Sequence, residues 1–190
     1  MALYARITLF TLVFIIGAIT ARGQSASEST VLQKPGMSAE SGKIKFLEGS
    51  YTTTTFIPPM PSMSKGATGK GTTDISWALD SMFLMVEEES FNSLLGHYKG
   101  HGMLGYESQT HQYVLSMFNN FGDHPTYRGS FAGDTLILLT KVPAPQGAFD
   151  QKLLWYRDGD AVKLTVLNDF GKGFLPAIEE TSTPVSHKAK

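Results

Sequence analysis

The chain has 190 residues, no cysteine and an almost balanced charge, with 16 basic and 17 acidic residues. The lack of cysteine excludes disulfides, thiol chemistry, iron–sulfur clusters and zinc held by cysteine. A surface so close to neutral carries no electrostatic footprint for nucleic acid or for an anionic membrane, so we expect neither as a partner.

Residues 1–23 have the pattern of a secretory signal peptide. Arg6 precedes the apolar run ITLFTLVFIIGAIT, and Ala21 and Gly23 put small residues before a cleavage site at Gln24. The run has about 14 residues, short of the roughly 20 that span a bilayer. We therefore expect an exported protein, periplasmic or secreted, with no stable membrane anchor after cleavage. An uncleaved anchor helix is the alternative.

The mature part divides into a lead-in, one domain and a tail. Residues 24–43 are rich in Ser, Gly, Ala and Lys without periodicity, which predicts a flexible lead-in. Residues 44–47 resemble a single turn that introduces the domain, which we place at 44–184, and residues 185–190 form a polar tail. The domain is large enough to fold around one hydrophobic core without disulfides.

Short apolar segments with turn residues between them predict strands from residue 49 onward. Residues 49–57, GSYTTTTFI, begin the series, because β-branched threonines favour extended backbone. Three prolines make residues 58–63 a loop, which is apolar and serves as either a lid or a plug at a barrel end. The remaining predicted strands are residues 69–79, 82–91, 94–106, 112–119, 126–131, 136–142, 152–157, 162–167 and 175–183.

About ten strands at 8–12-residue spacing, without a convincing amphipathic helix, predict an all-β fold. We expect a single antiparallel up-and-down β-barrel, with a sandwich as the alternative, because short hairpins connect the strands and closure removes exposed edges. Glycines 96, 100, 102 and 105 fall in one strand and indicate sharp bending there. Ten strands enclose more room than eight, so an internal cavity is plausible.

Several motifs resemble a family of exported bacterial proteins catalogued as domain of unknown function 1579. They are LEGSY at 47–51, the Pro/Met-rich residues 58–63, WALDSMFL at 77–84, GMLGY at 102–106 with Tyr113, and residues 116–122. The resemblance covers roughly residues 46–183. It implies a calycin-like barrel, related in shape to lipocalins and nitrobindins, and no agreed activity. The chain departs from the family pattern at Met117, where Trp is usual, and at Asn119, where Asp is usual.

Two histidine positions are weighed as chemical sites. His97 and His101 are four residues apart, which on a strand separates them by about 13 Å, so they do not share a metal and we expect both on the solvated outer face. Asp123 and His124 form a loop dyad at the barrel rim, between Gly122 and Pro125. It offers general-base chemistry or haem ligation, while a turn-forming Asp beside an incidental His is the simpler interpretation.

The acidic run Glu87-Glu88-Glu89 places Glu88 on the face opposite its neighbours. If that face is interior, the carboxylate is a ligand contact or an acid with a raised pKa. The alternative is that the strand emerges into solvent at this point.

Aromatic and methionine side chains that alternation turns inward are the candidate ligand-binding residues. They are Trp77, Phe83, Met85, Met117, Tyr127 and Trp155, with His124 added at the rim. The first interpretation is a barrel that binds a small, mostly apolar molecule. The alternatives are an enzyme or haem-type barrel that uses a rim or interior histidine, and a structural or interaction barrel with a filled core. We assign no catalytic residue, metal site or cofactor, and the sequence predicts no oligomeric state.

Overall fold

The computed structural model describes residues 37–59, 64–145 and 147–185, which belong to one compact unit, Pro35–Lys190. The predicted signal peptide, residues 24–36 of the predicted lead-in, residues 60–63 of the predicted lid or plug and residues 186–190 of the predicted tail lie outside the described residues. Within the described ranges, no helix is long and apolar enough to cross a membrane.

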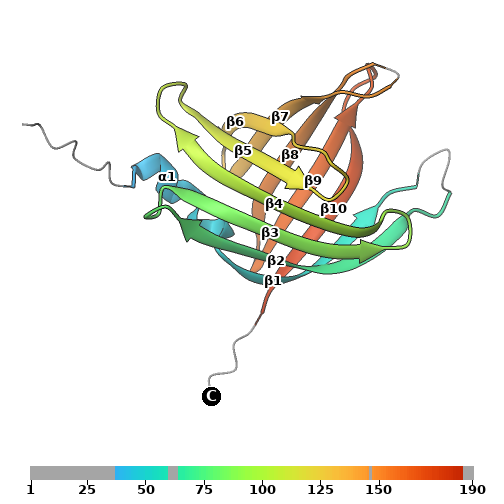
Figure 1. The fold of residues 1–190 in the computed structure, drawn as a ribbon, viewed down its shortest axis with the longest axis horizontal. Coiled ribbons are helices and arrows are strands. Elements are labelled where there is room, and N and C mark those ends of the chain that lie inside the picture. The colour runs from blue at the N-terminus through green and yellow to red at the C-terminus, as the bar shows by residue number, and fades with distance from the viewer. Residues whose placement is uncertain (1–36, 60–63, 146, 186–190) are drawn as a thin grey trace, which may run out of the picture. The chain divides into compact units, whose positions relative to one another are not determined.

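Ten antiparallel strands form one closed barrel, in which each strand pairs with the next along the chain (Figure 1). This confirms the predicted all-β, up-and-down barrel, and the predicted strands occur in the predicted order. The strands are β1 Gly49–Ile57, β2 Ala67–Ala78, β3 Phe83–Asn92, β4 Gly96–Glu107, β5 Gln112–Asn119, β6 Thr126–Ala132, β7 Thr135–Val142, β8 Phe149–Asp158, β9 Ala161–Asp169 and β10 Leu175–Pro184.

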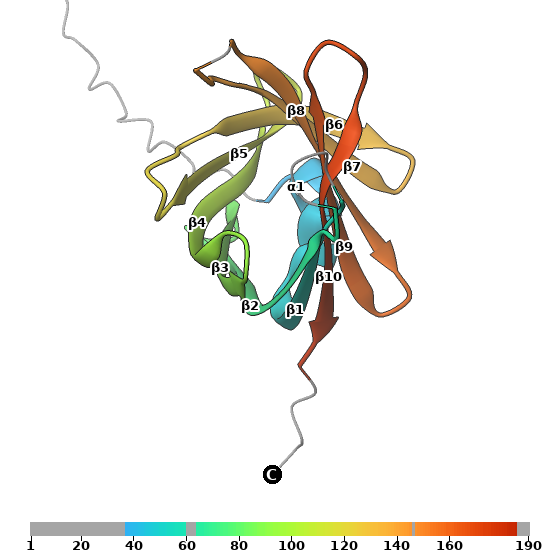
Figure 2. The same cartoon turned by 90° about the vertical axis from the view of Figure 1, so that its right-hand side faces the viewer.

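The first and last strands close the barrel. Strand β1 pairs with β10 from Tyr51 opposite Pro184 to Phe56 opposite Glu179, and it pairs with β2 on its other side. Figure 2 shows the resulting ring of strands, in which β10 lies between β1 and β9. Closure pairs the backbone groups that an open sheet would leave at its edges, which removes the usual site of edge-to-edge aggregation.

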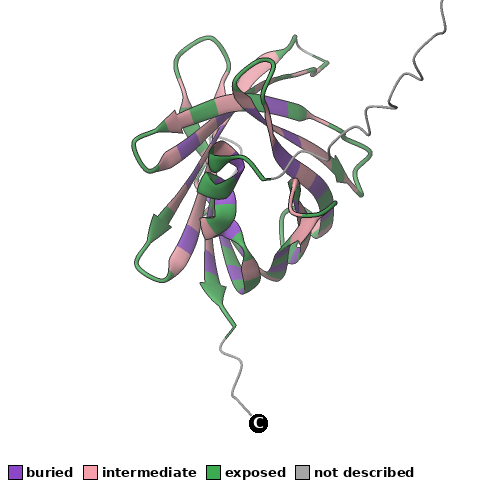
Figure 3. Cartoon of the chain, turned by 90° about the vertical axis from the view of Figure 1, so that its left-hand side faces the viewer, coloured by how far each residue is buried: buried purple, intermediate pink, exposed green. Residues whose placement is uncertain are grey.

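A helical segment covers one end of the barrel, which we call the plugged end. Helix α1 (Ala39–Lys43) and the 3₁₀ helix η1 (Ile44–Leu47) lie across the ends of the strands (Figure 3). The predicted flexible lead-in is therefore wrong for residues 39–43. Ser38 caps α1 by accepting a hydrogen bond of 2.9 Å from the backbone of Ser41, and five residues are too few to show an amphipathic period in the sequence.

The plugged end holds a close-packed apolar core. Ile44 and Leu47 of η1 are fully buried against inward side chains of the strands, among which Leu84, Leu104 and Leu136 are also 0% exposed. Tyr51 Oη donates to the carbonyl oxygen of Leu47 at 3.0 Å, so the barrel wall is hydrogen-bonded to the plug. Because this end is filled, any space for a ligand lies toward the opposite end.

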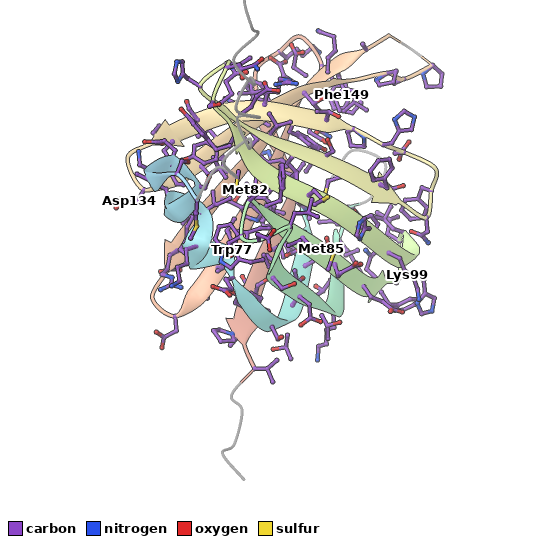
Figure 4. All side chains as sticks on the ribbon, turned by 60° about the vertical axis from the view of Figure 1, so that its left-hand side comes forward. Trp77, Met82, Met85, Lys99, Asp134 and Phe149 are labelled. Atoms are coloured by element: carbon purple, nitrogen blue, oxygen red, sulfur yellow. The ribbon has the colours of Figure 1, made fainter. Side chains whose placement is uncertain are left out.

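We call the opposite end the open end. In an up-and-down barrel every second hairpin turn lies at the same end, so the turns that follow β1, β3, β5, β7 and β9 meet there. Figure 4 marks the two ends with labelled side chains, with Trp77 near the helical segment and Phe149 toward the open end.

Candidate functional site

Inward side chains of the strands enclose a cavity of about 690 Å³ toward the open end. Residues of the β5–β6 and β7–β8 turns also line it, which places its mouth at the open end. Ligand pockets of drug-sized molecules typically have about 300–1,000 Å³. The cavity is therefore large enough for a small molecule, and the apolar core closes it at the plugged end.

One side of the cavity is largely apolar and comes mainly from β5 to β9. Trp155 of β8 and Tyr127 of β6 are each 6% exposed, and Met117 of β5 is partly buried beside them. Gly102 faces Met117 across the β4–β5 pair, where a larger side chain would collide with the methionine sulfur. The same strands add the aliphatic residues Leu115, Leu153, Val162, Leu164 and Val166, and also the polar residues Asn119, Thr126, Thr140, Lys141 and Gln151.

The other side of the cavity comes from β10, β1, β2 and β3, and it carries a row of polar side chains beside aliphatic ones such as Ile75 and Val86. Thr53 Oγ1 shares hydrogen bonds with Thr73 Oγ1 at 2.9 Å and with Ser182 Oγ at 3.3 Å. Ser182 Oγ in turn donates to Glu180 Oε1 at 3.2 Å. Neighbouring strands thus carry a continuous chain of hydroxyls that ends on a buried carboxylate.

Two glutamates face the cavity from this polar side, Glu88 of β3 and Glu180 of β10. Burial raises the pKa of Glu180 to about 7, against which the hydrogen bond from Ser182 acts. Burial also raises the pKa of Glu88 well above its ordinary value, and the charge of Glu180 raises it further. Of the two alternatives for Glu88, the structure shows the inward one, since β3 continues to Asn92.

Two tyrosine hydroxyls face the same space. Burial raises the pKa of Tyr127 to about 12, with a further contribution from the charge of Asp123. Burial, and then the charge of Glu88, raises the pKa of Tyr98 above its ordinary value. Tyr127 Oη donates to Gln151 Oε1 at 2.5 Å, which fixes the tyrosine against the apolar wall. Both hydroxyls stay protonated at neutral pH and are available as neutral hydrogen-bonding groups.

The predicted Asp123–His124 dyad lies in the β5–β6 turn at the mouth, and both residues are exposed. Asn119 holds this turn, because its Oδ1 accepts hydrogen bonds from the backbone N–H groups of Phe121 and Asp123 at 3.0 and 3.1 Å. The two side chains of the dyad make no hydrogen bond to each other, so Asp123 does not orient His124 as a general base.

The other predicted histidine pair lies on the outer face of β4, as expected. His101 Nδ1 is 2.6 Å from Glu87 Oε1, and the ring of His97 packs on Phe91 with centroids 4.9 Å apart. Among the described residues, no group of three or more His, Asp or Glu side chains is placed to hold a metal ion.

Of the seven predicted ligand-binding residues, Met117, Tyr127, Trp155 and His124 line the cavity. Trp77 packs against the plugged core instead, and its indole N–H donates to Glu48 Oε2 at 3.2 Å.

The inward orientation predicted for Phe83 and Met85 is wrong. Leu84 and Val86 are the buried residues of this segment, at 0% and 3% exposed, while Phe83 is 36% exposed. The ring of Phe83 covers the outer side of Gly105, its partner on β4, where a Cβ would collide with it. The absence of a side chain at Gly105 therefore leaves room for the ring of Phe83 on the outer surface of the barrel.

Three polar residues of the cavity, Thr55, Tyr98 and Glu180, are not among the predicted ligand-binding residues. Each lies on an inward face by alternation, as Ile178, Glu180 and Ser182 do along β10. The available signal was a carboxylate between two inward residues of a closing strand. Thr55 carried no such signal, because four threonines in succession do not distinguish the faces.

A scan of the chain against protein-family models and a search among curated proteins both find no match.

Proposed function

We propose that this protein binds a small, mostly apolar molecule in the cavity of its barrel. The observation that carries the proposal is the cavity of about 690 Å³ with Trp155, Tyr127 and Met117 on its wall. Aromatic and methionine side chains contribute large apolar contact areas and adapt to irregular ligands. The cavity favours this function over a structural barrel with a filled core, because the core fills only the plugged end.

The resemblance to domain of unknown function 1579 concerns the fold, since that family has no agreed activity, but it draws attention to two positions of the cavity. Met117 and Asn119, the two positions at which the chain departs from that family pattern, both line the cavity. If the family uses these positions to select ligands, this protein selects a different ligand from its relatives. Export to the periplasm or the medium, expected from residues 1–23, belongs to the proposal as well and places the ligand outside the cytoplasm.

The enzyme or haem-type alternative depends on His124. It is the histidine among the described residues that lines the cavity, and it lies at the mouth. A haem-loaded protein would show a strong visible absorption band as purified. An absorption spectrum of the protein therefore separates this alternative from a colourless carrier.

The test uses the full chain expressed in an exporting host, with native mass and absorption spectra recorded together. A neutral apolar dye, N-phenyl-1-naphthylamine, is then titrated into the protein. We expect saturation at one dye molecule per chain, with fluorescence enhanced by the apolar wall. Absence of both a bound molecule and a saturable dye site would overturn the proposal.

Two methionines provide matched variants for this titration. Met117→Trp places a large ring in the cavity and is expected to weaken dye binding at least tenfold (about 1.4 kcal/mol). Met85→Trp makes the same change on the outer face of β3 and is expected to leave dye binding unchanged. Equal effects of the two variants would place the dye elsewhere on the protein.

A further inference from the structure

The cavity buries acidic groups without a basic partner. Glu180 is 8% exposed and Glu88 is partly buried, and neither forms an ion pair with a described Lys or Arg. The cation that lines the cavity, Lys141, is exposed and pairs with Asp150 at 2.8 Å. Burying a carboxylate without a partner costs folding free energy. We therefore expect such a pair of residues to be retained because it has a function.

A second observation points to a ligand at the same place. Thr55 is 6% exposed and lies on the cavity wall, and its hydroxyl has no hydrogen-bond partner among the described residues. Thr55 stands directly opposite Glu180 in the β1–β10 pairing. Buried hydroxyls are almost always paired in native proteins, so this group requires a partner that the described chain does not supply.

The polar wall presents acceptor oxygens that few donors of the described residues engage. Glu180 receives one hydrogen bond, from Ser182, and Glu88 receives none from the described residues. The hydroxyls of Thr53 and Thr73 are engaged with each other. A group that complements this wall must donate several hydrogen bonds and carry positive charge, as an ammonium group does with three N–H donors.

We propose that the cavity binds an amphipathic amine, with its ammonium group held by Glu180, Glu88 and Thr55 and its apolar body against the wall formed by β5 to β9. This inference rests on the proposed function and specifies the chemical class of the ligand. The ammonium group supplies the positive charge that the glutamates lack and a donor for the hydroxyl of Thr55. The apolar body accounts for the aromatic and aliphatic wall opposite.

The charge state of the empty cavity agrees with this assignment. The titratable groups that face the cavity are Glu88, Glu180, Tyr51, Tyr98, Tyr127, Asp123, His124 and Lys141. Burial raises the pKa values of both glutamates, and the charge of Glu180 raises the pKa of Glu88 further, so the unliganded pair holds a proton near neutral pH. A cation between them favours ionisation of both, and binding therefore releases protons to the solvent.

The experiment compares three probes with the same eight-carbon chain by isothermal titration calorimetry at neutral pH. Octylammonium keeps its proton at this pH, as lysine does, while octanol is neutral and octanoate is anionic. We expect octylammonium to bind at least tenfold more tightly than octanol, and octanoate to bind most weakly. Repeating the titration in buffers of different ionisation enthalpy is expected to reveal proton release with octylammonium alone.

Variants assign the preference to the two glutamates. Glu180→Gln and Glu88→Gln are expected to abolish the tenfold preference for octylammonium over octanol, while octanol still binds. Glu179→Gln and Glu87→Gln, on the outer faces of the same strands, are the matched controls and are expected to keep the preference. Circular dichroism melting curves verify that each variant is folded.

Two outcomes overturn the inference and are distinguishable. If octanol binds as well as octylammonium, or if the inner variants keep the preference, the cavity binds apolar molecules but the amine assignment is wrong. If none of the three probes binds, the amine assignment is overturned, and the proposed carrier function falls with it only when the protein as purified also holds no bound molecule and shows no saturable dye site.

Discussion

At the plugged end, the tyrosine hydroxyls that reach the core are paired, with Tyr51 donating to Leu47 and Tyr113 donating to the carbonyl oxygen of Glu40 at 2.8 Å. Toward the open end, β1 carries the hydroxyl of Thr55, and β3 and β10 carry the carboxyl groups of Glu88 and Glu180, none of which has a hydrogen-bonding or cationic partner of the required kind among the described residues beyond the bond from Ser182 to Glu180. Strands β1, β3 and β10 contribute to both ends. One end of the barrel is therefore packed and hydrogen-bonded for stability, while the other retains unfavourable polar groups that the proposed ligand would pair.

The largest difference in stability between the ends is expected from cavity-forming substitutions. Leu104→Ala removes a side chain that is 0% exposed in the plugged core and is expected to lower the free energy of unfolding by about 2–5 kcal/mol. Leu95→Ala, at the mouth, removes a side chain that is 42% exposed and is expected to cost less than about 1 kcal/mol. Urea unfolding of both variants measures the difference, and equal losses would contradict the division between the ends.

The pH dependence of stability tests the open end. The pKa of Glu180 rises from 4.5 to about 7 on folding, so the folded protein binds this proton more tightly than the unfolded chain. Below about pH 4.5 the protonated carboxyl contributes its full share, roughly 3 kcal/mol, to the free energy of unfolding. This contribution is lost as the pH rises to about 7. Unfolding free energies at pH 4.5 and pH 8, compared between the wild type and Glu180→Gln, isolate this contribution.

A matched control for that comparison is Glu179→Gln, since Glu179 is exposed on the outer face of β10. We expect Glu179→Gln to keep the pH dependence of the wild type. If Glu180→Gln keeps it too, then Glu180 is ionised in the folded protein at neutral pH with a compensating partner.

The smallest effect concerns two threonines of β1 that face the same way. Thr53→Val removes the hydrogen-bond partner of Thr73 and one of the two partners of Ser182, which keeps its bond to Glu180, and is expected to cost about 1–2 kcal/mol. Thr55→Val removes the unpaired hydroxyl with little change in shape and is expected to be neutral or stabilising by up to about 1 kcal/mol. Thermal unfolding of the pair gives the comparison, and a larger loss for Thr55→Val would mean that this hydroxyl is paired.

Alternation and turn residues were sufficient to predict the barrel, because each strand carries its own period and each hairpin its own turn. They were insufficient for the start of β3, since residues 82–86 are apolar on both faces and the choice of face depends on Gly105 of another strand. The grouping of Glu180 with Thr55 in the cavity could not be predicted from local sequence patterns for a related reason. Thr55 becomes the neighbour of Glu180 only through closure of the barrel, which no stretch of adjacent residues encodes.

The pairing of the first strand with the last also has a consequence expected for folding. The hydrogen bond between Thr53 and Ser182 joins residues 129 positions apart. Pairing β1 with β10 therefore costs more loop-closure entropy than pairing any two consecutive strands. Hairpins between consecutive strands form earlier, and Glu180 reaches the cavity only when β10 docks. We therefore expect the chain to keep an open, aggregation-prone edge until β10 docks, and the pairing of Thr55 with Glu180 to form at that step.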